Sequence, residues 1–126
     1  MDISTVVDGK LAIRRHIVRG AFDFTELKSY LGEIYGSPDL DPSMNVLWDL
    51  READFSTVSR DEVQSVMEFV SKTWGTEGRS KAALVVKNDL DYGFSRMYQM
   101  MMEGATSSKV EVFRDLDAAE TWIRTS

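Results

Sequence analysis

Hydrophobic positions near the start of the chain fall in two runs that predict a β-hairpin. The runs Ile3–Val7 and Leu11–Val18 are rich in β-branched residues, and they flank the pair Asp8-Gly9. This pair favours a two-residue type I′ turn, because both central residues of that turn need positive φ. Arg15 falls on the apolar face of the second run, which predicts a bulge near Arg14-Arg15 or a partly open face.

Apolar residues then recur at helical spacing in two segments that open with capping signals. The segment Gly20–Gly36 predicts a helix with Asp23 as its cap and Glu26 three residues later. Ser59 starts a second helix, with Glu62 at the matching position. Both pairs are typical of a capping box, in which each residue's side chain bonds the backbone N–H of the other.

Two further helices follow in the second half of the chain. Asp91 is the expected cap of a helix that ends at Gly104, and Asp115 is the expected cap of the last helix. Helical spacing predicts the inner face of the third helix, which consists of Phe94, Met97, Tyr98 and Met101.

Three short runs are apolar at nearly every position and predict strands: Val46–Leu50, Lys81–Lys87 and Val110–Phe113. Such continuity is typical of strands that are covered on both faces of a parallel sheet. Polar segments at Asp39–Ser43 and Gly75–Ser80 predict connections. The order β-β-α-β-α-β-α-β-α predicts an α/β fold with a mainly parallel sheet of about five strands, an antiparallel first strand and about four helices. We expect a single domain over residues 1–126.

Composition narrows the classes of function. The chain has no cysteine, which excludes disulfides and thiolate chemistry. Its formal net charge of −6 disfavours nucleic acid as a partner. The first residues lack the basic and apolar regions of a secretion signal, and no apolar run approaches the roughly 18 residues of a membrane span. We therefore expect a cytoplasmic protein.

Four segments of the chain carry a resemblance to a known family. They are the opening hairpin, the strand that ends in Asp49-Leu50, the strand Lys81–Val86 and the segment Val110–Ile123. These segments are similar to the STAS domains (sulfate transporter and anti-sigma factor antagonist), in their stand-alone SpoIIAA-like branch. The last segment, VEVFRDLDAAETWI, is the most specific, because it resembles an ending common in that branch. The resemblance implies a SpoIIAA-like fold over nearly the whole chain.

The segment after the Asp-Leu strand departs from that family. Bacterial anti-sigma factor antagonists carry an Asp-Ser-x-Gly turn, and a partner kinase phosphorylates its serine. The matching segment Asp54–Asp61 contains neither an Asp-Ser pair nor a glycine. Ser56, Thr57 and Ser59 can accept phosphate by residue type, but the motif that would identify one of them is absent. The resemblance therefore implies the fold more strongly than it implies regulation by phosphorylation.

Candidate binding residues lie where the predicted strands meet the following helices, since ligands of open α/β sheets bind at that edge. Asp49 ends one buried strand, and Asn88–Tyr92 follows the next. The alternative gives these polar groups local roles, with Asp49 bonding loop amides, Ser59 capping a helix and Asn88–Tyr92 forming a capped turn. The candidates for binding a ligand or partner are Asp49, Asp54, Ser56, Thr57, Ser59, Asn88, Asp89 and Tyr92.

A second group of candidates concerns self-association. Phe69, Met100 and Met102 fall outside the predicted apolar stripes of their helices, and with Tyr92 they would form an exposed apolar patch. Such a patch indicates an interface, so we expect a homodimer. The alternative is that the methionines belong to the core with incidental exposure.

Catalytic chemistry has little support in the residue pattern. His16 is the lone histidine, and no nucleophile–base pair, metal cluster or glycine-rich phosphate loop is visible. We therefore expect neither an enzyme nor a metal or cofactor. A small enzyme that uses carboxylates such as Asp49 and Asp89 would need the two groups close together in a dry site.

The pattern favours a non-enzymatic cytoplasmic binding or regulatory module that docks a protein partner or a small ligand at the strand-to-helix loops. The alternative is a carrier of lipid or another apolar ligand at a membrane surface, because the SpoIIAA-like branch also resembles Sec14-type lipid-binding domains. A cavity between a helix and the sheet, lined by Phe or Met, would favour the alternative. A filled core with a flat exposed patch would favour protein docking.

Overall fold

The computed structural model describes residues 1–38, 41, 43–74, 81–105 and 109–125. Within these residues the elements are β1 (Asp2–Asp8), β2 (Ile13–Ala21), α1 (Phe24–Tyr35), β3 (Asn45–Asp54), α2 (Arg60–Trp74), β4 (Lys81–Val85), α3 (Asp89–Ala105), β5 (Lys109–Phe113) and α4 (Leu116–Arg124). Their order confirms the predicted alternation of strands and helices. The expected polar turn at Gly75–Ser80 lies outside the described residues, as does part of the expected connection at Asp39–Ser43.

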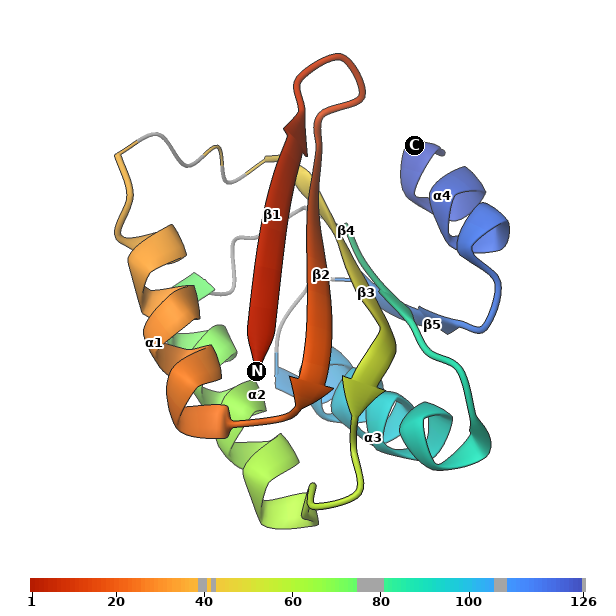
Figure 1. The fold of residues 1–126 in the computed structure, drawn as a ribbon. Helices are drawn as coiled ribbons and strands as arrows, with labels where there is room; N and C mark the ends of the chain where they lie inside the picture. The colour runs from red at the N-terminus through yellow and green to blue at the C-terminus, as the bar shows by residue number, and fades with distance from the viewer. Residues whose placement is uncertain (39–40, 42, 75–80, 106–108, 126) are drawn as a thin grey trace.

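The strands form one sheet in the order β1-β2-β3-β4-β5. β1 is antiparallel to β2, and the other neighbouring strands are parallel, as predicted. Helices α1, α2 and α3 lie on one face of the sheet, and α4 lies alone on the other (Figure 1). α4 packs against β3, β4 and β5. The two faces of the sheet therefore have separate layers of packing.

The connection in the hairpin is longer than the predicted two-residue turn. β1 ends at Asp8, which is paired with Ile13, so residues 9–12 form the connection. The Asp8 carboxylate accepts hydrogen bonds from the backbone N–H groups of Lys10 and Leu11, at 3.0 and 3.1 Å. Ala12 has φ +54°, a conformation that a residue with a side chain seldom adopts. Asp8 thus organises a wider turn through its side chain, which the Asp-Gly pattern alone does not predict.

The irregularity in β2 pairing lies further along than the predicted bulge near Arg14-Arg15. Ile17 pairs with Asp49 of β3, and the next pair is Arg19 with Glu52. Between these pairs β2 advances by two residues and β3 by three, so the extra residue belongs to β3. The extra residue increases the local twist and lets the two strands stay paired to their ends.

Helix α3 is rotated relative to the prediction. Its buried residues are Asp91, Ser95, Gln99 and Met102, whereas the predicted inner face of Phe94, Met97, Tyr98 and Met101 is only partly buried. α3 contacts both β5 and α2, so two of its faces meet other elements and hydrophobic spacing alone does not separate them. Polar residues enter the buried face because they bond within the helix: Gln99 accepts from Arg96 at 2.6 Å and donates to Glu103 at 3.2 Å.

The core has two parts, one on each face of the sheet. Under α4, Ala83, Val85 and Ala119 are fully excluded from solvent and pack with Ile13, Leu47 and Ile123. The larger part lies between the sheet and α1–α3 and includes Val18, Leu31, Leu50, Val66, Leu84 and Val112. The larger layer also contains the cavities described below.

Candidate functional site

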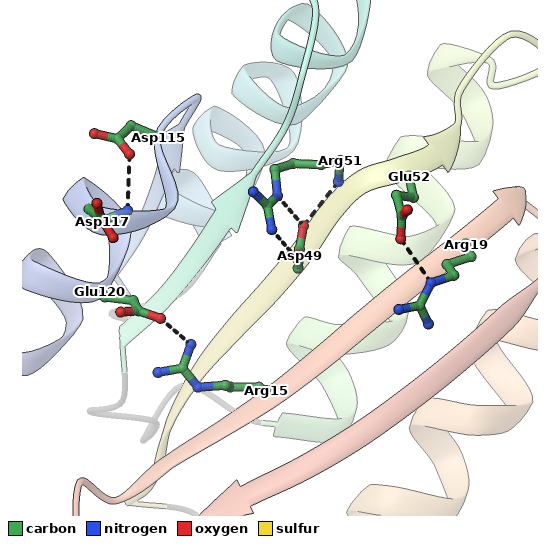
Figure 2. A network of polar contacts seen from close by, with 8 residues as sticks. All are labelled: Arg15, Arg19, Asp49, Arg51, Glu52, Asp115, Asp117 and Glu120. Atoms are coloured by element: carbon green, nitrogen blue, oxygen red, sulfur yellow. Dashed lines mark hydrogen bonds and ion pairs between the residues drawn. The ribbon is translucent and has the colours of Figure 1, made fainter.

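Asp49 lies inside a strand rather than at its end. β3 continues to Asp54, because residues 52–54 pair with residues 19–21 of β2, a pairing that the local sequence does not reveal. The Asp49 carboxylate accepts from Arg51 at 2.9 Å (Nε) and 2.8 Å (Nη2), and from the Arg51 backbone N–H at 3.2 Å (Figure 2). These hydrogen bonds hold the pKa of Asp49 below its usual range. Asp49 is thus a charged partner of its own strand, in line with the local role weighed above.

The same polar surface continues from β2 to α4. Arg15 donates to Glu120 of α4 at 2.5 Å, and Arg19 donates to Glu52 at 2.8 Å (Figure 2). The Arg15–Glu120 pair links the sheet to α4, which explains why an arginine is placed on the otherwise apolar face of β2. These ion pairs join neighbouring elements of the fold. They bring no two carboxylates close together in a dry site, which the hypothesis of a carboxylate enzyme would need.

The loop after β3 presents three exposed candidates, Asp54, Ser56 and Thr57. Asp54 accepts from the backbone N–H of Ser56 at 2.8 Å, and its bonds to Ser56 lower the pKa of the Asp54 carboxyl. Ser59 forms the predicted capping box: its hydroxyl accepts from the Glu62 N–H at 3.2 Å, and Glu62 accepts from the Ser59 N–H at 3.1 Å. The polar groups of this loop therefore shape the start of α2.

The segment after β4 forms a capped turn, which is the alternative that the sequence analysis gives to a binding loop at Asn88–Tyr92. Asn88, rather than Asp91, caps α3: its side-chain oxygen accepts from the Asp91 N–H at 3.0 Å. Asp89 is exposed and pairs with Arg114 at 2.5 Å. The same guanidinium lies 4.8 Å from the centre of the Tyr92 ring, a cation–π distance. Asp89 and Tyr92 thereby connect α3 to the end of β5.

Asp91 is buried in the structure, whereas the sequence pattern assigned it only to capping. Its side chain lies in the first turn of α3 and is 3% exposed. Burial raises the pKa of the Asp91 carboxyl, and the nearby charge of Asp54 raises it further. Even so, the described residues hold no group of three His, Asp or Glu side chains that could bind a metal ion.

The expected apolar patch does not form as predicted. Met102 is 2% exposed and belongs to the core, whereas Met100 is 64% exposed. Phe69 is half-buried and faces α1, where its ring tip lies 4.0 Å from the position a Cβ would take at Gly32. The rotation of α3 and the packing of α2 on α1 cause this outcome. Self-association stays a prediction, but Met100 alone of the three residues is available for it.

An apolar cavity lies between the sheet and α1–α3, and its volume is about 110 Å³. We call it the main cavity. Its outer part is formed by the segments that join strands to helices, where Phe22 stacks on Phe24 at 5.5 Å and meets Phe55 edge-on at 4.8 Å between ring centres. The residues that line it are Phe22, Phe24, Leu27, Leu31, Tyr35, Trp48, Leu50, Phe55, Val58, Val63, Val66, Val70, Leu84, Phe94, Ser95 and Tyr98.

The binding residues predicted from the sequence do not include the residues that line this cavity. The three phenylalanines at the strand-to-helix connections were the available signal, since aromatic residues are unusual in exposed turns. The main cavity lies at the edge of the sheet where the sequence analysis expects a ligand, beside the polar loop residues, and its lining is mainly apolar. Binding at this edge stays a prediction.

A second cavity of about 50 Å³ adjoins the first toward the amino ends of the parallel strands. We call it the polar cavity, because Arg14 and His16 form part of its wall. The two cavities share five lining residues: Leu31, Tyr35, Trp48, Val70 and Tyr98. The remaining walls of the polar cavity are Ile34, Val46, Ala82, Met102 and Val110.

His16 is buried, with 1% exposure, and its ring is fixed from several sides. Its Nε2 accepts from Arg14 Nε at 3.1 Å, and its Nδ1 lies 2.9 Å from the Thr5 hydroxyl and 3.3 Å from the Tyr30 hydroxyl. Burial, followed by the charge of Arg14, lowers the pKa of His16 to about 3. His16 is therefore neutral near pH 7, and its Nε2 serves as an acceptor for Arg14.

Arg14 brings a positive charge into the buried layer. It is 6% exposed, and burial lowers the pKa of its guanidinium below the usual value, although an arginine keeps its proton in proteins. Tyr35 lies close enough to interact with that charge. Burial also raises the pKa of Tyr35 to about 12 and raises the pKa of Tyr98. Both phenol groups thus remain protonated near neutral pH, and both tyrosines line the polar cavity.

Comparison with known proteins supports the fold. No protein-family model and no curated protein matches the chain. A solved structure does: an uncharacterised protein of the DUF3478 family with a SpoIIAA-like fold, from Shewanella loihica PV-4. The match has a TM-score of 0.63 at 15% identity and covers 97% of this chain and 92% of the other. At that identity the likeness concerns the fold alone, and it confirms the SpoIIAA-like fold implied by the resemblance to STAS domains.

None of the described helices is both long and apolar enough to cross a lipid bilayer.

Proposed function

We propose that this protein is a non-enzymatic cytoplasmic binding module that takes up a small apolar ligand in the main cavity. The observation that carries the proposal is a cavity of about 110 Å³ with an almost wholly apolar lining. For comparison, an engineered apolar cavity of roughly 150 Å³ stays dry and takes up benzene. A ligand of ring size or a short acyl chain is the matching class.

The position of the cavity supports the same proposal. Ligands of open α/β sheets bind at the carboxyl ends of the strands, and Leu50, Phe55 and Val58 of the lining belong to the end of β3 and the following loop. Phe22, Phe24 and Phe94 are half-buried, so part of the aromatic wall lies near the surface. In this proposal the ligand enters at that end of the cavity, near the first turns of α1 and α3.

The local roles of the polar candidates also favour a ligand over a phosphorylation switch. Ser59 is committed to the capping box, and Asp49 is committed to Arg51. Phosphate on Ser59 would lie beside Asp61 and Glu62, and like charges oppose such a modification.

The test is binding of 1-octanol, followed as a shift in the thermal unfolding midpoint. We expect the wild type to be stabilised in a concentration-dependent manner, because the ligand binds only the folded state. Val66→Phe adds volume inside the lining and should abolish the shift. The matched control is Met100→Phe, an enlargement at an exposed position, which should keep it.

A second measurement tests whether the purified protein already carries a ligand. Native mass spectrometry should show a small bound mass that is lost on denaturation, and Ser95→Leu, which fills the cavity from α3, should carry less of it. The proposal is wrong if 1-octanol leaves the wild-type midpoint unchanged and no bound mass is found. It is also wrong if the folded Val66→Phe and Ser95→Leu variants respond to 1-octanol as the wild type does.

A further inference from the structure

Asp91 brings a carboxylate into the buried face of α3 without a partner for it. The residue is 3% exposed, yet within the described residues its side chain accepts no hydrogen bond and forms no ion pair. Every fully enclosed side-chain nitrogen or oxygen in the same part of the chain does have a hydrogen-bond partner. The Asp91 carboxylate oxygens therefore share in the small surface that the residue exposes, and they remain open as acceptors.

Asp91 continues the row of α3 residues that line the two cavities. Met102 lines the polar cavity, Tyr98 lines both cavities and Ser95 lines the main cavity. These positions share one face of the helix, because they are three or four residues apart. Asp91 is four residues before Ser95 and lies about 6 Å further along the helix axis. It therefore lies just beyond the outer end of the main cavity, in the turn of α3 that follows β4.

The end of β3 adds a second carboxylate at the same place. Asp54 directly precedes Phe55, which lines the main cavity. Burial, followed by the negative charge of Asp54, raises the pKa of the Asp91 carboxyl. Asp49 on the same strand differs, because it is paired with Arg51. A cation bound beside Asp91 would offset both the cost of burial and the repulsion between the two carboxylates.

We propose that the ligand is a small amphipathic amine, with its apolar body in the main cavity and its ammonium group on the Asp91 carboxylate. This inference rests on the proposed function and specifies its ligand class. Phe55 and Phe94 line the cavity near Asp91, and the faces of aromatic rings attract cations. The described residues offer no group of three His, Asp or Glu side chains, so the chemistry favours an organic cation over a metal ion.

The experiment compares octylammonium with 1-octanol and octanoate by isothermal titration calorimetry at pH 7.5. The three ligands share an apolar chain and differ in the charge of the polar end. We expect the wild type to bind octylammonium at least about tenfold more tightly than 1-octanol, as a hydrogen bond to a charged group contributes that much. Octanoate should bind more weakly than 1-octanol, because its carboxylate would meet two others.

Two variants of equal net charge locate the ammonium group. Asp91→Asn keeps the shape of the side chain and should remove the preference for octylammonium while leaving 1-octanol affinity unchanged. The matched control is Asp117→Asn, which removes an exposed charge from the first turn of α4 on the other face of the sheet. It should keep the preference, because general attraction to an acidic protein is the same in both variants.

The outcomes separate the inference from the proposed function. If all three ligands bind the wild type equally, the inference is wrong and the apolar binding function stands. If none binds, the proposed function itself fails and the inference fails with it. If Asp91→Asn retains the preference, or if Asp117→Asn loses it to the same degree, the assignment to Asp91 is overturned. If Asp91→Asn does not fold, Asp91→Ser replaces it: the inference requires a preference weaker than that of the wild type, and an unchanged preference contradicts it.

Discussion

At the scale of single residues, His16 couples stability to pH. The folded protein keeps His16 neutral down to about pH 3, whereas an unperturbed histidine takes up a proton near pH 6.5. Between these values the unfolded state binds more protons, so stability is complete above pH 6.5 and falls as the pH is lowered. His16 is the lone histidine, and other side chains of unperturbed pKa titrate outside the range from pH 5 to 6.5. The raised pKa of Asp91 acts in the opposite direction, so a loss of stability on acidification in this window reports on His16.

We therefore expect the wild type to lose roughly 2 kcal/mol of unfolding free energy between pH 6.5 and pH 5. Urea denaturation at several pH values measures the loss. His16→Gln has no titrating ring, so its stability should be nearly constant over this window even if it is lower overall. A wild-type curve as flat as that of the variant would contradict the neutral, buried state of His16.

At the scale of elements, the caps of α1, α2 and α4 were accessible from the sequence because capping is local, whereas the cap of α3 is Asn88 and not the predicted Asp91. Asp23 accepts from the backbone N–H groups of Thr25 and Glu26, and Ser59 and Asp115 also cap as predicted. The extension of β3 to Asp54 was not accessible, since it depends on pairing with residues of β2 that lie more than thirty positions earlier. The main cavity and the polar cavity were missed for a similar reason: they depend on how three helices meet the sheet.

The rotation of α3 provides a matched pair of methionines two positions apart. Met102 is buried and Met100 is exposed, although the sequence pattern treated them alike. Met102→Ala should cost about 2–5 kcal/mol, the usual loss for a truncated core side chain, whereas Met100→Ala should stay within about 0.5 kcal/mol. Equilibrium denaturation of both variants checks the rotation, and equal losses at the two positions would show that α3 is oriented differently.

At the scale of the whole molecule, the layers on the two faces of the sheet are packed differently. The layer under α4 is filled by apolar side chains, and the Arg15–Glu120 ion pair joins β2 to α4 beside it. The layer under α1–α3 contains two cavities and a buried cation. A small domain can leave part of one layer unfilled if the other layer is well packed, because each contributes burial of its own. A binding space is thus compatible with a chain of this length.

Neighbouring alanines of β4 test this difference, because successive side chains of a strand point to opposite faces. Ala83 is fully buried under α4, so Ala83→Val should overpack that layer and cost about 1–3 kcal/mol. Ala82 lines the polar cavity of about 50 Å³, so Ala82→Val has space for its added methyl groups and should change stability by less than about 1 kcal/mol. Urea denaturation of the two variants gives the comparison. Equal destabilisation would mean that both layers are filled, and the binding proposals would then lose their structural basis.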